Sequence, residues 1–532
     1  MTSTTRPTKF CEGITRRNAL KNLGGMIAAS AMNPRMMSGT EAAQNATAPA
    51  SSGQLPKRPN ILWITGEGVP PPALSCYGGR LLKTPNIDRI AQEGVRFENA
   101  FCTNGLCAPS RATLLTGTYS HINGMTGNPE VTSPGDAGPP RFDPAQETIA
   151  TILKRNGYQT GMVGKWHLPV NPAKTGFDYF VYKEGSGGGR SYYDPTGYLG
   201  NPSLGSDEIQ PQRHEGYQTD VVTDLTIKGM EQFKQPFLMM VQFFNAHRPW
   251  DPPHKYEHLY DKERLPEPGT FWDDYKRRAD PARAARMRIE DMPDFTPPAD
   301  LTGRQRKQWN YQKYMQHFLG TLRSQDDNVG RLLKYLDDNG LAENTIVVYT
   351  SDHGFFLGDH GWFDKRFMYE QAIRVPWIIR CPGAAGRGSV RSDWVINIDN
   401  APSVLQLAGL PIPIQMQGQS IVPILRGEKS SAAQRALYYH YYEFGDPHWV
   451  APHYGIRTER FKLISYYTEN EWELFDLEKD PDEMENLFID NGRHVQAGYE
   501  AIVPELINQL KQLRQHYKDT TGFPVKLSGP GD

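Results

Sequence analysis

Short apolar runs alternate with amphipathic stretches along the chain from Pro59 onwards. Four runs have the length and apolar content of buried strands: NILWIT (60–65), TGMVG (160–164), PFLMMVQFF (236–244) and TIVVYT (345–350). The stretches between them have helical periodicity and predict helices over 85–94, 109–116, 146–156, 218–234 and 304–339. This alternation is typical of an α/β fold, so we expect a large, mostly parallel sheet sandwiched by helices.

The pattern changes after about residue 425, where strand-forming residues gather in three runs. These runs are LYYHYYEF, YGIRTERFKLISYY and EWELFDL, and a helix is predicted around 496–517. We therefore expect a large domain over 58–425 and a smaller C-terminal α+β subdomain with an antiparallel sheet over 426–532. Residues 265–300, dense in Pro, Asp and Arg, are interpreted as a solvated excursion between elements.

The first 32 residues contain the parts of an export signal in their usual order. Arg16 and Arg17 precede a short, weakly apolar stretch with small residues, which resembles a twin-arginine signal; a disordered basic tail is the alternative. Residues 33–57 are expected to be a linker, and no later run approaches the ~18 apolar residues of a membrane span. We expect an exported protein, periplasmic or secreted, without stable membrane insertion.

Charge and cysteine content narrow the function classes. The 58 basic and 60 acidic residues give a net charge of -2, which does not favour a nucleic-acid partner. The cysteines lack the CxxC spacing of a zinc site or a dense disulfide framework. Cys76 and Cys381 are interpreted as buried small hydrophobic residues, and a disulfide between Cys102 and Cys107 stays an alternative.

Polar side chains follow each of the four predicted strands. In parallel sheets, ligands bind beyond the carboxyl ends of the strands, so these side chains are expected to share one edge. They are Gly66 and Glu67, Lys165 and His167, His247, and Asp352 and His353.

The stretch CAPSRATLLTG (107–117) places Cys107 just ahead of a helix that we expect to begin at Pro109. The free amides at a helix start favour an anion, and the guanidinium of Arg111 suits a tetrahedral oxyanion. The motif therefore predicts an anion pocket with a reactive atom at its mouth. By itself it also fits a structural thiol, or a low-pKa nucleophile that works with a histidine.

Several motifs together resemble the formylglycine-dependent sulfatases of the alkaline phosphatase superfamily. They are CAPSR with the following LLTG, GKWHL (164–168), NAHRPW (245–250), SDHGFFLGDHGWFDKRFMYEQAIRVP (351–376) and DPDEMENL (480–487). The resemblance covers most of residues 59–490. It implies an alkaline-phosphatase-like fold and a sulfuric ester hydrolase.

The resemblance also implies roles for individual residues. A formylglycine-generating maturation enzyme would oxidise Cys107 to formylglycine (3-oxoalanine), whose hydrate is the nucleophile. His247 would protonate the departing sugar oxygen, and His167 would help to deprotonate the hemiacetal. Three cationic residues would hold the sulfate oxygens: Arg111, Lys165 and Lys365.

The metal ligands implied by the family are incomplete in this chain. Calcium would be held by Glu67, the modified Cys107, Asp352 and His353. Gly68 stands where the family usually has a second acid, so we predict weaker metal binding. Asp359 and His360 are open between support of the site and a loop turn.

The substrate is expected to be a sulfated carbohydrate, because the resemblance is closest to carbohydrate sulfatases such as N-acetylglucosamine-6-sulfatase. This implies a 6-sulfated amino sugar in a glycosaminoglycan, mucin or other glycan, held by Asp364, Arg366 and His453. Trp250, Trp362 and Trp449 are candidates for stacking on a sugar face, against the alternative of packing.

Two other functions remain open at this stage. One is a phosphate mono- or diester hydrolase of the same superfamily, although members without formylglycine carry Ser or Thr as the nucleophile. The other is a sulfated-glycan binding protein whose metal site is impaired at Gly68. The two histidines, His167 and His247, argue against the second, since binding alone does not need both.

Overall fold

The computed structural model describes residues 55–130, 139–183, 191–196, 198–201, 209–428, 435–445, 447–489 and 494–522. The predicted signal (1–32) lies outside these residues, and so does the predicted linker (33–57) up to residue 54. Within the described part of the chain, none of the helices combines the length and apolar composition that a bilayer span requires.

A ten-stranded mixed sheet forms the centre of the fold, in the order β12-β2-β11-β8-β1-β7-β3-β4-β5-β6. The four predicted strands are its parallel central strands: β1 (Asn60–Gly66), β3 (Gln159–Lys165), β7 (Phe237–Gln242) and β8 (Thr345–Ser351). The sequence did not predict the outer strands: β2 (Val95–Phe101), β4 (Tyr179–Lys183), β5 (Tyr198–Asn201), β6 (Gln210–Gln212), β11 (Trp377–Arg380) and β12 (Ser389–Ile396).

Two hydrophobic cores lie on the two faces of this sheet. Successive side chains of a strand point to opposite faces, so Ile61 and Trp63 of β1 enter one core while Leu62 and Ile64 enter the other. A strand that is apolar on both faces must be covered on both, and this explains why β1 reads as a continuous apolar run.

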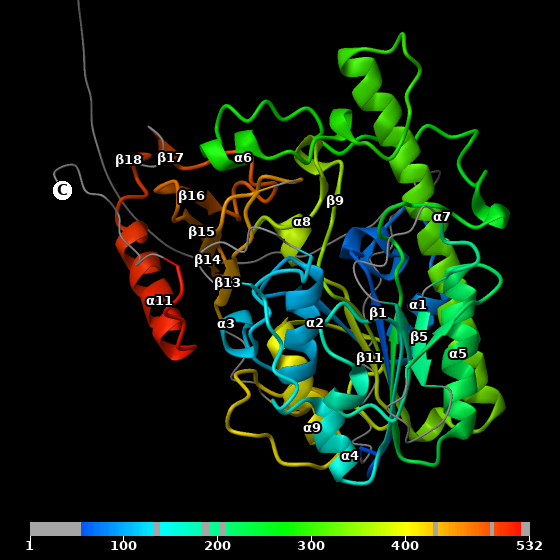
Figure 1. Cartoon of the computed structure of the whole chain (residues 1–532). Helices are drawn as coiled ribbons and strands as arrows, with labels where there is room; N and C mark the ends of the chain where they lie inside the picture. The colour runs from blue at the N-terminus through cyan, green and yellow to red at the C-terminus, as the bar shows by residue number, and fades with distance from the viewer. Residues whose placement is uncertain are drawn as a thin grey trace, which may run out of the picture. The chain divides into compact units, whose positions relative to one another are not determined.

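Helices cover both faces, which confirms the predicted sandwich (Figure 1). One face carries α2 (Cys107–Thr116), α4 (Ile149–Arg155) and α9 (Asn400–Leu407). The other carries α1 (Pro85–Glu93), α5 (Gln218–Gln232) and the long α7 (Gly303–Asp338). The short helices are α3 (Ser120–Asn123), α6 (Asp280–Ala284), α8 (Glu370–Ile373) and α10 (Val422–Leu425).

The C-terminal part contains the expected antiparallel sheet, with four strands rather than three. They are β13 (Leu437–Tyr441), β14 (His453–Arg457), β15 (Phe461–Tyr466) and β16 (Glu471–Asp476). The run YGIRTERFKLISYY is a hairpin because Thr458 closes a turn with Phe461. Smaller elements are β9 (Phe356–Leu357), β10 (Phe363–Asp364), β17 (Phe488–Ile489), β18 (His494–Val495) and α11 (Ile502–His516). The domain boundary near residue 425 stays a prediction, since one core runs through both parts.

Candidate active site

Cys107 is the first residue of α2, at the carboxyl edge of the sheet. Leu106 before it is extended, and all residues of α2 are buried. The prediction that the helix begins at Pro109 is wrong by two residues. Pro109 still lies in the first turn, where its missing N–H breaks no intrahelical hydrogen bond.

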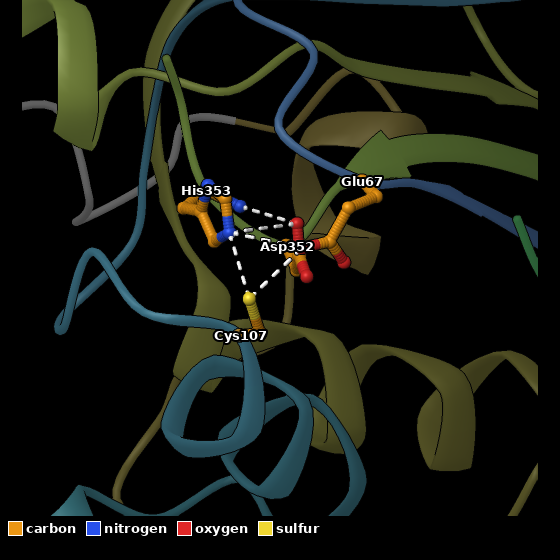
Figure 2. Close-up of side chains that lie close together, drawn as sticks. All are labelled: Glu67, Cys107, Asp352 and His353. Carbon is orange, nitrogen blue, oxygen red and sulfur yellow. Dashed lines mark hydrogen bonds and ion pairs between the residues drawn. The ribbon is translucent and has the colours of Figure 1, made fainter. Parts of the chain in front are cut away.

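Four side chains converge at this edge (Figure 2). Glu67 follows β1, Asp352 and His353 follow β8, and one ligand atom of each, with that of Cys107, lies within 4.8 Å of the others. His353 Nε2 is 3.5 Å from Glu67 Oε1, 3.5 Å from Asp352 Oδ1 and 3.4 Å from Cys107 Sγ. Ligands at right angles and ~2.4 Å from an ion are about 3.4 Å apart, so the spacing fits a divalent cation.

Charge within this group also fits a cation. Burial and the neighbouring Glu67 carboxylate raise the pKa of Asp352 to about 6. Burial lowers the pKa of His353, but Asp352 and Cys107 together outweigh it and raise that pKa to about 10. A neighbouring carboxylate contributes to each shift, and a bound cation would offset the negative charge of both carboxylates.

Gly68 occupies a position that an acidic side chain cannot enter without a rearrangement. Its φ is +62°, and a Cβ placed on it would lie 2.7 Å from Cδ2 of Phe355. Its N–H donates to Asp352 Oδ1 at 3.2 Å. The group therefore has two carboxylates, and the space beside Gly68 is filled by an aromatic ring.

Arg111 forms ion pairs with both carboxylates, through the oxygens that do not face His353. Its Nη2 lies 2.7 Å from Glu67 Oε2 and 3.0 Å from Asp352 Oδ2, and Nε donates to Asp352 Oδ2. Its Nη1 donates to the carbonyl of Lys165 and to Oε1 of Gln242. All three guanidinium nitrogens are thus engaged by the protein, so the predicted contact of Arg111 with sulfate oxygens lacks a free donor.

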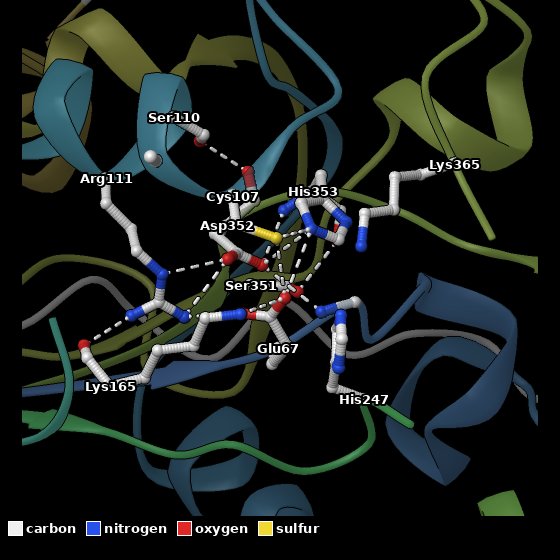
Figure 3. Close-up of polar contacts among 12 residues, drawn as sticks. Glu67, Cys107, Ser110, Arg111, Lys165, His247, Ser351, Asp352, His353 and Lys365 are labelled. Atoms are coloured by element: carbon white, nitrogen blue, oxygen red, sulfur yellow. Dashed lines mark hydrogen bonds and ion pairs between the residues drawn. The ribbon is translucent and has the colours of Figure 1, made fainter. Parts of the chain in front are cut away.

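Two lysines bring further positive charge to Cys107 (Figure 3). Lys165 ends β3, and its Nζ lies 2.8 Å from Glu67 Oε1; Lys365 follows β10 and approaches from another direction. Both side chains are almost fully buried. Both positive charges lower the pKa of Cys107, and they would attract an anion beside it.

The thiol of Cys107 differs from every other described cysteine. Burial and Glu67 raise its pKa, but Lys165, Lys365 and His353 together hold that pKa well below the usual range. Burial raises the pKa of Cys76, Cys102 and Cys381, to about 12 for Cys381. All four are free, so the alternative of a disulfide between Cys102 and Cys107 is wrong. Cys76 is only half-buried, unlike the prediction.

The two predicted catalytic histidines lie in different environments. His247 Nδ1 is 3.0 Å from the carbonyl of Arg248, and burial and Lys165 hold the pKa of this histidine well below its usual value. His167 Nε2 is 3.0 Å from Glu130 Oε2. Burial lowers the pKa of His167, but the interactions with Cys107 and Glu130 raise that pKa overall.

The predicted sugar-binding residues are only partly brought together. Asp364 Oδ1 accepts from Arg366 at 2.7 Å, and its Oδ2 is 2.7 Å from His448 Nε2. His453 is fully buried, and its Nδ1 contacts the carbonyl of Ala451. The rings around His453 are those of Phe367, Tyr439, Tyr441 and Tyr466. The histidine that joins Asp364 is thus His448, five residues earlier in a loop.

The predicted tryptophans and His360 contact other protein side chains. Trp250 and Trp362 are 1% and 0% exposed, so neither can stack on a sugar; half-buried Trp449 lies under Arg286 at 4.5 Å. His360 Nδ1 is 3.0 Å from Asp273 Oδ2, which also pairs with the buried Arg278. Since Asp273 and Arg278 belong to 265–300, this segment is not simply a solvated face, and His360 supports the fold there.

Comparisons with known proteins agree with this geometry. The sulfatase family model matches residues 59–410, and the model for the C-terminal part of N-sulphoglucosamine sulphohydrolase matches residues 358–516. The N-acetylglucosamine-6-O-sulfatase of Bacteroides thetaiotaomicron is 39% identical over 516 residues, covering 87% of each chain. The ulvan-active sulfatase of Formosa agariphila is 30% identical, covering 81% of this chain and 77% of the relative.

A solved structure of a protein in complex with its substrate D-glucosamine-2-N,6-O-disulfate is similar over most of its length. It is 38% identical with a TM-score of 0.79, and the match covers 88% of this chain and 99% of that one.

Proposed function

Since the chain belongs to the sulfatase family and is therefore a sulfuric ester hydrolase, we propose that it removes the 6-O-sulfate of an amino sugar in a sulfated glycan. The observation that carries this is Cys107, a buried thiol with a lowered pKa among two carboxylates and two lysines. The relatives named above support the carbohydrate substrate. Neither a phosphate ester substrate nor a purely binding role has comparable support.

Cys107 is the residue that the family generally converts to formylglycine, and conversion here by a maturation enzyme is part of the proposal. Formylglycine supplies, as its hydrate, a hydroxyl nucleophile that attacks sulfur. Calcium would be held by Glu67, Asp352, His353 and the modified residue, and would offset their negative charge. The donor set of two carboxylate oxygens and one imidazole nitrogen fits this group, although one carboxylate fewer is present than the family usually has.

The other residues around Cys107 then act on the sulfate ester. Lys165 and Lys365 attract the sulfate oxygens, while Arg111 keeps the carboxylates in place. His247 donates a proton to the departing oxygen from Nε2, since its Nδ1 is held by a backbone carbonyl. The negative sulfate would offset the two lysine charges that lower the pKa of His247, which favours its protonated form when substrate is bound.

Sugar recognition is assigned to Asp364, Arg366 and His448 in place of His453. Asp364 accepts from both neighbours, so the three largely buried side chains form a connected polar group beside Lys365. Polar groups fixed in this way can discriminate one arrangement of hydroxyls from another.

A pair of histidine variants tests this assignment. We expect His448→Ala to lower kcat/KM for N-acetylglucosamine-6-sulfate roughly 10- to 100-fold and to change hydrolysis of a small aryl sulfate little. The matched control, His453→Phe, should leave both activities near wild type because its imidazole packs within the core. Activity on aryl sulfates alone, with no sulfate released from any 6-sulfated amino sugar, would refute the proposed substrate.

Export through a twin-arginine signal in residues 1–32 completes the proposal. That route carries folded proteins, so modification of Cys107 and metal loading can both precede export. We expect Arg16→Lys together with Arg17→Lys to retain active enzyme in the cytoplasm, as measured by fractionation. Unchanged export would show that another feature directs it.

A further inference from the structure

A short loop, residues 128–130, touches three parts of the active-site region. Asn128 Oδ1 accepts from the N–H of Ala108, next to Cys107, at 3.1 Å. The N–H of Asn128 donates to Glu443 Oε1 at 2.6 Å. Two residues on, Glu130 Oε2 lies 3.0 Å from His167 Nε2. The loop is therefore fixed at Asn128 just before Glu130 reaches the histidine.

The contact between Glu130 and His167 joins an accessible carboxylate to a buried ring. The side chain of His167 is 0% exposed and that of Glu130 is 49% exposed. The second ring nitrogen, Nδ1, is also buried and has no hydrogen-bond partner among the described residues. Cys107 lies close enough to His167 for its side chain to raise the pKa of the histidine. A buried nitrogen without a hydrogen-bond partner lowers the stability of the fold, unless a ligand or reacting group contacts that nitrogen.

A carboxylate can only accept hydrogen bonds, so the imidazole nitrogen that faces Glu130 must carry the proton. In a neutral imidazole the other nitrogen then carries the lone pair. We propose that Glu130 is the positioning residue of His167: it holds the tautomer with the proton on Nε2, and so leaves Nδ1 as the base for the group at position 107. This inference rests on the proposed function, in which His167 removes a proton from that group.

The proton balance of the step is simple. With formylglycine at position 107, Nδ1 of His167 would accept the proton of its hydroxyl group. The electron pair of that O–H bond would re-form the carbonyl, and the bond from this carbon to the sulfate oxygen would break, with its electron pair leaving on sulfate. The Nε2 proton stays on the ring and is shared with Glu130, which remains ionised. The Nδ1 proton then passes to water and restores the neutral ring. A carboxylate that orients a histidine in this way is a recurrent catalytic device.

The first test does not depend on turnover. In full-length Cys107→Ala protein labelled with ¹⁵N-histidine, NMR should show His167 protonated at Nε2, and His167→Gln would identify its signals. Adding Glu130→Ala should populate the tautomer protonated at Nδ1. An unchanged tautomer without Glu130 would overturn the inference, whether or not the protein proves to be a sulfatase.

The second test uses mature enzyme. Glu130→Ala should lower kcat roughly 10- to 100-fold with little change in KM, and Glu130→Gln, which keeps an accepting oxygen, should recover part of the loss. Glu147→Ala is the matched control, since Glu147 pairs with Arg155 at 2.7 Å on the surface and should change neither parameter. A loss confined to KM, or no loss, would contradict the role; no activity in wild type would instead refute the proposed function.

Discussion

Two buried clusters of charged side chains can be compared in this molecule. The strand-end cluster consists of Glu67, Cys107, Arg111, Lys165, Asp352, His353 and Lys365. The subdomain cluster joins α8 to the C-terminal sheet and consists of Glu370, Arg457, Lys462 and Glu483. Both combine two carboxylates with lysine and arginine, so residue type alone does not distinguish them.

The subdomain cluster is balanced. Lys462 Nζ lies 2.9 Å from Glu370 Oε1 and 2.5 Å from Glu483 Oε1, while Arg457 reaches Glu370 at 3.2 Å. Arg374 also lies 4.0 Å from Glu370, at the edge of the cluster. Each charged side chain therefore has a partner of opposite charge. Such an arrangement holds elements together but offers little to a ligand.

The strand-end cluster differs because its charges surround a reactive atom. Arg111 and Lys165 pair with the two carboxylates, and Lys365 lies 3.4 Å from Asp364 beside the cluster. Lys165, Lys365 and His353 also act on Cys107, whose pKa is lowered against the effect of burial. The comparison teaches that buried charge directed at one reactive atom, rather than buried charge as such, marks the functional site.

The largest expected effect comes from removing the reactive atom. Cys107→Ala should lower kcat/KM for sulfate ester hydrolysis by roughly 10⁴-fold or more, since the nucleophile is lost. The matched control is Cys102→Ala, which removes another buried free thiol and should retain most activity. Full activity of Cys107→Ala would contradict the assignment of the strand-end cluster as the catalytic one.

The balanced cluster should respond in stability rather than catalysis. Lys462→Met leaves two buried carboxylates without their shared cation and should lower the free energy of unfolding by about 3 kcal/mol. Turnover per folded molecule should stay near wild type, as measured beside denaturant unfolding. The exposed Lys479, 3.8 Å from Asp476, provides the control: Lys479→Met should change stability by less than about 0.5 kcal/mol. A turnover defect in Lys462→Met would show that the clusters are coupled.

Calcium affinity is a further property that we expect to depend on the strand-end cluster. Because Gly68 replaces an acid, calcium should bind more weakly than in sulfatases with two adjacent acids, and Glu67→Gln should weaken it by roughly another 10- to 100-fold. Calorimetric titration measures both. Asp326→Asn, which alters a buried acid outside the strand-end cluster, should not change the affinity. Tight wild-type binding comparable with those sulfatases would contradict the expected effect of Gly68.

The smallest effect concerns pH. Burial lowers the pKa of His453 to about 3, whereas an unfolded histidine titrates near ~6.5. As pH falls between these values the unfolded chain gains a proton that the folded protein does not bind, so stability decreases. His453→Phe should make the acid-side decline in the free energy of unfolding less steep, as measured by urea unfolding at several pH values. An unchanged slope would show that His453 is not the group responsible.

The sequence predicted the parts of the fold whose signal is local. The central strands are buried on both faces and appear as continuous apolar runs, whereas β2, VRFENAF, mixes exposed and buried positions and was missed. The hairpin of β14 and β15 was read as one run because its turn, TERF, has neither glycine nor proline.

The residues of the candidate site also divide into those with a local sequence signal and those without one. Glu67, Cys107, Asp352 and His353 could be identified because they follow strands or stand in a motif. Glu130, Gln242 and His448 could not, since each acts through a partner far away in the chain: His167, Arg111 and Asp364. Arg111 was correctly placed beside Cys107, but its contacts with both carboxylates depend on how three separate segments converge.

The central claim is that Cys107 is converted to formylglycine, and that the strand-end cluster supports sulfate ester hydrolysis by this residue. Its most direct test is the mass of the peptide from Asn104 to Arg111 in protein recovered from its native host. The account predicts the mass of formylglycine at position 107. An intact thiol in every molecule would contradict it and would leave the proposed hydrolase without its nucleophile.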